Sequence, residues 1–136
     1  MNTSIFSAVR AAHVEIDAMI EKAAGMNISR YLVLSVIGES NAVTRDQIAS
    51  ATGLSYNGVV EVTRWLQRQE WIEQEGKAPA QIFLSLTEEG ARVWSGARLA
   101  AIVVEQKLIN RIDSPISGII HALAALSTEK ITEGSD

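Results

Sequence analysis

The sequence contains no cysteine, which limits the chemistry available to this chain. Without a thiol it can form neither a disulfide framework nor a thiolate zinc site, and it has no cysteine redox switch. Its two histidines, His13 and His121, lie on opposite terminal segments and show no metal-ligand spacing. We therefore expect no bound metal.

Sequence motifs of the common enzyme classes are also missing. The chain has no glycine-rich phosphate loop, no H-E-x-x-H and no G-x-S-x-G. Its carboxylates are spread along the sequence as on solvated helix faces. These absences predict a protein that is not an enzyme and that needs no cofactor.

Long apolar runs are absent as well. The longest one, Leu99 to Val104, is far shorter than the roughly 18 residues of a membrane-spanning helix. The N-terminus lacks the basic-then-apolar order of a signal peptide. With 47% apolar and 21% charged residues among 136, the sequence predicts one folded domain in the cytoplasm, with no membrane contact.

Basic charge is scarce. The formal net charge is −4, and residues 43–81 carry four basic against five acidic side chains. A protein that binds nucleic acid usually presents a basic surface to the phosphates. Any such function must therefore depend on which helix face each charge occupies.

The most informative stretch runs from Thr44 to Ile72 and predicts two helices around one tight turn. Thr44 and Gln47 form a T-x-x-Q capping box at the first start, and Ser55 can cap the second helix. Gly53 lies where the chain must reverse, a place that usually needs positive φ. The pattern is that of a helix-turn-helix. An ordinary helical hairpin is the alternative.

A β-hairpin is predicted directly after the second helix. Trp71 to Glu75 has strand character, residues 76–80 form a turn cluster, and Gln81 to Leu86 alternates. The apolar positions of the second strand that share one face are Ile82, Leu84 and Leu86. A helix-turn-helix followed at once by a hairpin, or wing, is a winged helix.

Helices are predicted on both sides of this unit. Apolar spacing predicts one from Ser4 to Ala24, ended by Gly25. A short buried helix follows from Ile28 to Gly38, capped by Asn27 or Ser29, and residues 39–43 form a polar connection.

Two further helices are predicted after the wing. Thr87 caps a long helix that continues to Ile112, about 39 Å at 1.5 Å per residue. Ser114 and Pro115 begin a last helix that carries apolar residues to Leu126. The terminal helices hold more apolar surface than a monomer tolerates in water. We therefore expect a homodimer, with a monomeric bundle as the alternative.

The order of these elements, with the strand end FLSLTEEG (Phe83 to Gly90) before a long apolar helix, resembles the MarR family of transcriptional regulators. The resemblance covers nearly the whole chain, although LT-x-x-G after a wing recurs in several winged-helix families. It implies a mainly α fold with a small β-wing, a winged helix-turn-helix whose N- and C-terminal helices form a dimerisation region. The expected divisions are a DNA-binding lobe at 28–90, dimerisation segments at 1–25 and 91–127, and a flexible tail at 128–136.

The resemblance also implies a function, that of a homodimeric repressor more than an activator. Two-fold symmetry would place two recognition helices roughly 34 Å apart on a pseudo-palindrome in double-stranded DNA. A small-molecule ligand would release the dimer by changing that separation. The lack of cysteine excludes the oxidation mechanism that some MarR-like repressors use.

The candidates for DNA contact on the second helix fall into two groups. Ser55, Tyr56 and Asn57 begin the helix, where Asn can pair with adenine and Tyr or Ser can reach phosphate. Arg64 and Arg68, one turn apart, would hold phosphates or reach a guanine. A solvated face is the alternative for both arginines, because Glu61 and other acidic residues lie close in sequence.

Three further candidates lie at the start of the first helix, and one lies in the wing. Thr44, Arg45 and Gln47 could bind backbone phosphate with the amides of the helix end. The wing offers only Lys77, with Glu75 in front of it, where MarR-like wings usually carry more basic residues. We expect weak or strongly salt-sensitive DNA binding.

A small aromatic ligand is the other partner that the resemblance implies, between the dimer helices and the DNA-binding lobe. Four residues on suitable elements are candidates for such a pocket: His13, Tyr31, Trp94 and Arg98. Core or surface positions are the alternative for each. The competing function is a protein-binding winged helix, in which the acidic wing and the terminal helices dock a partner.

Overall fold

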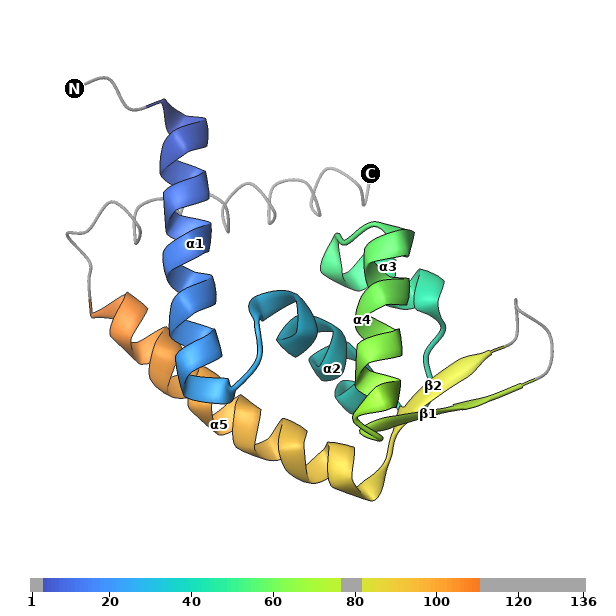
Figure 1. Cartoon of the computed structure of the whole chain (residues 1–136). Coiled ribbons are helices and arrows are strands. Elements are labelled where there is room, and N and C mark those ends of the chain that lie inside the picture. The colour runs from blue at the N-terminus through green and yellow to red at the C-terminus, as the bar shows by residue number, and fades with distance from the viewer. Residues whose placement is uncertain (1–3, 77–81, 111–136) are drawn as a thin grey trace, which may run out of the picture.

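A computed structural model describes residues 4–76 and 82–110, which form five helices and one two-stranded antiparallel sheet (Figure 1). The elements are α1 (Ile5–Ala24), α2 (Ile28–Glu39), α3 (Arg45–Thr52), α4 (Tyr56–Arg68), β1 (Ile72–Glu75), β2 (Phe83–Leu86) and α5 (Glu88–Ile109). Their order and type confirm the mainly α fold with a small β-wing. Lys77, the predicted helix from Ser114 to Leu126, His121 and the tail at 128–136 lie outside the described residues, and the domain divisions stay predictions.

The helix starts follow from short polar side chains. In each of the five helices described, the N-cap side chain accepts a hydrogen bond from the backbone amide three residues on. The five caps are Ser4, Asn27, Thr44, Ser55 and Thr87. Gly25 and Gly53 end α1 and α3 with φ of 77° and 78°. The caps at Thr44, Ser55 and Thr87 and the two glycine ends are as predicted. Asn27, and not Ser29, caps α2, and that helix ends at Glu39, one residue after the predicted Gly38.

One apolar core joins α2, α3, α4 and the sheet into a unit that we call the winged lobe. Its fully buried side chains are Val33, Leu34, Ile37, Ile48, Val59, Leu66 and Leu84. They come from four elements, so each element buries its apolar face against the others. The helix-turn-helix is held by this core and not by its turn alone.

The wing pairs Ile72 with Leu86 and Glu75 with Phe83. Its second strand alternates as predicted, because Leu84 is buried while Phe83 is 41% exposed. One detail differs from the sequence interpretation. β1 begins at Ile72, since the Trp71 amide still donates to the Leu66 carbonyl at the end of α4.

The connection at 39–43 is not simply polar. Val43 is 4% exposed and forms an isolated bridge with Leu84, with N···O distances of 3.1 and 2.7 Å. Its apolar side chain joins the lobe core, and its backbone adds a third short segment to the sheet. One valine in a polar segment was too weak a signal to predict this.

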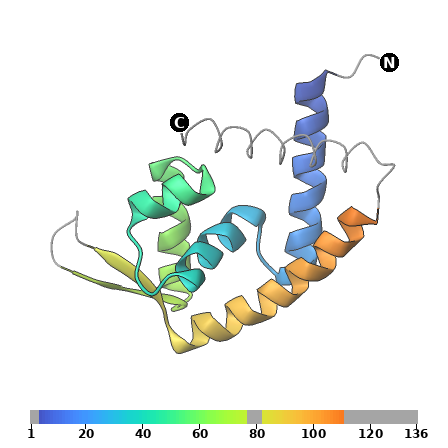
Figure 2. The same cartoon turned by 180° about the vertical axis from the view of Figure 1, so that it is seen from behind.

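α5 runs along the base of the molecule, from the wing to α1, in both views (Figures 1 and 2). A second, smaller core joins these two terminal helices through Ile20, Ala101 and Val104. The structure describes α5 as far as Ile109, with Asn110 at the C-cap position, and the predicted end at Ile112 lies outside the described residues.

The terminal helices α1 and α5 carry most of the exposed apolar surface described. Seven of the ten exposed large hydrophobic residues belong to them, including Phe6 at 83% and Leu99 at 67%. Apolar residues thus lie on more than one face of α5, as predicted. No helix within the described ranges is both long and apolar enough to cross a membrane.

Candidate nucleic-acid interface

The rear of α4 is fixed to the rest of the winged lobe. Val59 and Leu66 are fully buried, and so is the hydroxyl-bearing Thr63. The Thr63 Oγ1 donates to the Val59 carbonyl at 2.8 Å and accepts from the Arg45 Nε at 3.0 Å. A buried polar group with both bonds made costs little and locks α3 to α4. The two helices therefore present their outer faces as one unit.

The start of α4 faces solvent. Tyr56 is 51% exposed and Asn57 is exposed, while the Ser55 Oγ accepts the Gly58 amide at 3.0 Å. The Asn57 amide can offer a donor and an acceptor together, which is what an adenine edge requires. A base contact by Ser55 would have to share the oxygen that caps the helix.

The side chains at the start of α3 bond within the protein. The Thr44 amide donates to the Gln47 Oε1 at 2.9 Å, and the Gln47 amide donates to the Thr44 Oγ1 at 3.2 Å. The predicted capping box is thus confirmed. Because Arg45 bonds Thr63, all three predicted phosphate ligands of this helix already order the helix-turn-helix.

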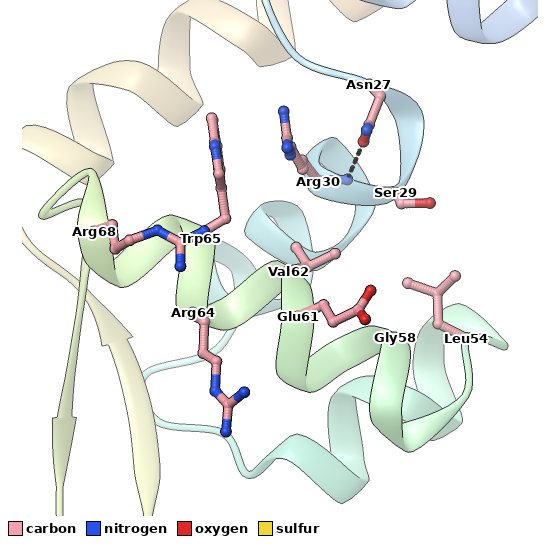
Figure 3. Close-up of a pocket in the computed structure, with 10 residues that line it drawn as sticks. All are labelled: Asn27, Ser29, Arg30, Leu54, Gly58, Glu61, Val62, Arg64, Trp65 and Arg68. Carbon is pink, nitrogen blue, oxygen red and sulfur yellow. Dashed lines mark hydrogen bonds between the residues drawn. The ribbon is translucent and has the colours of Figure 1, made fainter.

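A cleft of about 550 Å³ lies between the start of α2 and one face of α4 (Figure 3). Its lining comprises Asn27, Ser29, Arg30, Leu54, Gly58, Glu61, Val62, Arg64, Trp65 and Arg68. Three arginines and one glutamate give this lining a formal charge of +2. We call it the α2–α4 cleft. It joins the predicted Arg64 and Arg68 to a basic residue from another helix.

That residue, Arg30, was missed by the sequence interpretation. Its Cζ lies 3.9 Å from the centroid of the Trp65 ring, a cation–π contact that holds the guanidinium over the indole. Trp65 in turn packs edge-on against Trp71, with centroids 5.3 Å apart. One sequence signal could have found it: Arg30 lies in the first turn of its helix, where the helix dipole disfavours a positive charge.

The charges of the α2–α4 cleft are not neutralised by ion pairs within the described ranges. The ion pair found among the described residues joins Arg92 to Glu89 at 2.9 Å, and both residues lie on α5, away from the cleft. Glu61 lines the same cleft as Arg64 but forms no ion pair with it among the described residues. An incoming anion would therefore meet arginines without first displacing a carboxylate.

The wing adds acidic side chains to this surface. Glu73 and Glu75 are exposed on β1, and the Gln67 Nε2 donates to the Gln74 Oε1 at 2.9 Å, which ties α4 to the strand. Lys77, the one predicted basic contact of the wing, lies outside the described residues. The basic charge described on the lobe is concentrated at α4 and the start of α2.

The four predicted ligand residues do not line the α2–α4 cleft. His13 is exposed on α1, and Tyr31 packs against both cores. The Trp94 Nε1 donates to the Ser35 Oγ at 3.2 Å, and the Arg98 Cζ lies 5.3 Å from the Trp94 ring. The structure thus brings Trp94 and Arg98 together, beside α2, and leaves His13 apart.

The part of the chain that the structure describes contains no cluster of side chains that could ligate a metal. No three His, Cys, Asp or Glu side chains gather there closely enough to hold an ion.

A helix-turn-helix, a wing and two long flanking helices define a winged-helix protein with a helical extension. Among solved structures, the fold matches BpsR of Bordetella bronchiseptica, whose DNA binding is regulated by 6-hydroxynicotinic acid (TM-score 0.78, 15% identity, 92% of this chain and 94% of that one). It also matches a probable transcriptional regulator from Pseudomonas aeruginosa (TM-score 0.76, 16% identity, 90% and 95%).

A MarR/EmrR family transcriptional regulator from Acinetobacter sp. ADP1 matches as well (TM-score 0.72, 18% identity, 95% of this chain and 92% of that one). The chain therefore has the fold of MarR-family regulators over nearly its whole length. No protein-family model matches the sequence, and a search of curated proteins finds no match either. At such identities the likeness establishes the fold, and the function must be argued from the site.

Proposed function

We propose that this protein is a DNA-binding transcriptional regulator that inserts α4 into the major groove. The observation that carries the proposal is the capped, exposed start of α4, with Tyr56 and Asn57 facing solvent on a helix whose rear is buried. A recognition helix must combine a rigid back with a free front, because base contacts depend on its placement. The fold supports the same conclusion, since its structural neighbours are transcriptional regulators and not enzymes.

A homodimer would complete this regulator. Exposed apolar side chains on α1 and α5, among them Phe6, Val14, Leu99 and Val103, supply the surface that a second copy would cover. Two-fold symmetry would set two copies of α4 on the half-sites of a pseudo-palindrome. Such a dimer bound over a promoter in the cytoplasm would act as a repressor.

A small aromatic ligand would regulate the dimer. One structural neighbour is regulated by 6-hydroxynicotinic acid, and a MarR from Staphylococcus aureus was solved with salicylate and kanamycin. In this chain, Trp94 and Arg98 on α5 pair an aromatic ring with a cation beside Ser35 of α2, which suits an aromatic acid. His13 would join this site only from a second copy or after a movement of α1.

The DNA proposal is tested by titrating the dimer against the duplex upstream of its own gene at two salt concentrations. Binding should tighten at the lower salt, because phosphate contacts release counterions. Asn57→Ala should reduce the preference for that duplex over a scrambled one, and Arg64→Ala should weaken binding to both. Equal affinity of the wild type for every duplex, or no binding, would favour the protein-binding alternative.

Oligomeric state and effector have separate tests. Light scattering should report a dimer at micromolar concentration, and a monomer there would exclude the dimer.

Salicylate at constant ionic strength should lower DNA affinity in the wild type and not in Arg98→Gln. An equal response of both proteins would remove Arg98 from the ligand site.

A further inference from the structure

We propose that a backbone phosphate of bound DNA enters the α2–α4 cleft, where Arg30 and Arg68 hold it and Trp65 positions Arg30. This inference rests on the proposed function and adds a contact from α2 to it. It concerns affinity and not sequence preference, because phosphate contacts carry no base information.

The charge distribution of the lobe favours this site. The chain as a whole carries −4, and the wing strand presents Glu73 and Glu75. Three arginines nevertheless gather on one cleft, and none of their guanidinium groups forms an ion pair among the described residues. An anion bound in the cleft would reduce the repulsion among the like charges that line it. A phosphate would supply that anion.

The position of Arg30 is costly for the free protein. It occupies the first turn of α2, at the positive end of the helix dipole, where an acidic residue would be favoured. The stack on Trp65 at 3.9 Å offsets part of that cost and orders the side chain. An ordered guanidinium loses little entropy when it binds a phosphate, and its planar fork suits two phosphate oxygens.

The cleft is continuous with the surface that would read bases. Gly58, next to Asn57 at the start of α4, belongs to its lining, and Arg68 lies at the far end of the same helix. In Figure 3, Trp65 is drawn between Arg68 and Arg30, while Arg64 points away from this pair. Arg64 and Arg68 are exposed, so a partner as large as a duplex can reach them. DNA held by α4 would thus bring a phosphate strand along the cleft.

The salt dependence of DNA binding tests the contact directly. Arg30→Gln should weaken binding roughly tenfold at low salt, by the same factor on the upstream duplex and on a scrambled one. The slope of log K against log salt concentration should fall in magnitude by about 0.9, the value for one lost phosphate contact. Arg92→Gln is the matched control, because it removes one exposed positive charge on α5 and should leave the slope unchanged.

The role of Trp65 is tested with the charge of Arg30 left in place. Trp65→Leu removes the aromatic face and should lower the salt slope like Arg30→Gln, whereas Trp65→Phe keeps a ring and should restore most of it. Arg30→Gln combined with Trp65→Leu should lose no more slope than Arg30→Gln alone. A loss of stability without a change in slope would show that Trp65 is only a packing residue.

The outcomes separate this inference from the proposed function. If Arg30→Gln binds DNA with wild-type affinity and slope while Arg64→Ala binds weakly, the phosphate site is wrong and the regulator stands. If the wild type binds no duplex, both fail. If sodium benzoate quenches the tryptophan fluorescence of the wild type but not that of Arg30→Gln, and the DNA slopes of the two agree, the cleft holds a free organic anion instead.

Discussion

The winged lobe and the helices α1 and α5 differ in how much of their apolar surface is buried within the chain itself. Within the described residues, eleven buried residues form the core around the lobe, and three form the core between α1 and α5. Seven of the ten exposed large hydrophobic residues lie on those two helices. The lobe thus has its own folding core, while α1 and α5 leave apolar surface to be covered. Under the proposed function, DNA reading and dimer assembly would therefore lie in separate regions of the molecule.

The largest expected effect comes from the lobe core. Leu34→Ala should lower the free energy of unfolding by about 3 kcal/mol, because Leu34 is fully buried and the truncation leaves a cavity. Urea denaturation measures it, and the loss should not depend on protein concentration. Leu99→Ala, at a residue that is 67% exposed, is the contrast. It should cost about 0.5 kcal/mol or less in dilute protein and more as concentration favours the dimer. Equal losses at all concentrations would remove the distinction between the regions.

The contact between the winged lobe and the start of α5 should be nearly as sensitive to substitution. Gly90, in the first turn of α5, has no room for a Cβ, which would overlap the Trp71 carbonyl. Gly90→Ala should therefore destabilise by about 2 kcal/mol in thermal or urea unfolding, since backbone atoms must shift. Gly96→Ala is the matched control on the same helix, where a Cβ meets nothing within 4 Å. It should be neutral or stabilising by up to about 1 kcal/mol.

A second contact ties α1 to the start of α2. The Asp17 Oδ1 accepts the Ile28 amide at 2.7 Å, in addition to the Asn27 cap. Asp17→Ala should cost about 1 kcal/mol in urea unfolding, the usual value of a lost cap. Glu21→Ala, at an exposed residue on the same helix, should change stability by less than about 0.5 kcal/mol. If the two variants behave alike, the contact between the regions contributes nothing measurable.

The smallest effect has the opposite sign. Glu70 follows α4 with φ of 64°, a left-handed conformation that costs a residue with a Cβ about 1 kcal/mol. Glu70→Gly should raise the unfolding temperature, because the Thr87 hydroxyl bonds the Glu70 carbonyl and not its side chain. Gln69→Gly, next to it at φ of −76°, should lower that temperature. A fall in both variants would mean that the turn is not strained.

Much of the fold could be predicted because its signals are local. Thr44, Gln47, Gly53 and Ser55 set the ends of α3 and α4 through bonds within four residues, and the structure places each as expected. Alternation around Leu84 likewise predicted the wing. Val43 was misinterpreted because a single apolar residue has no period, and its partner Leu84 lies far along the chain.

The candidate site could be predicted only in part. The exposure of Tyr56 and Asn57 follows from the face opposite the buried residues of α4. Arg30 could not be assigned to the site, because it contacts Trp65, a residue of another helix more than thirty positions further along the sequence. The charge count over residues 43–81 could not include Arg30, because Arg30 lies on α2, outside that range.

The sequence alone determined the helices, their caps, the turn between α3 and α4 and the wing, since each depends on neighbours within a few residues. Tertiary structure decided which charges share a surface. The α2–α4 cleft and its stacked Arg30 exist only because the lobe core packs α2 against α4. Packing brings distant residues together through burial of apolar surface, which has no direction along the chain.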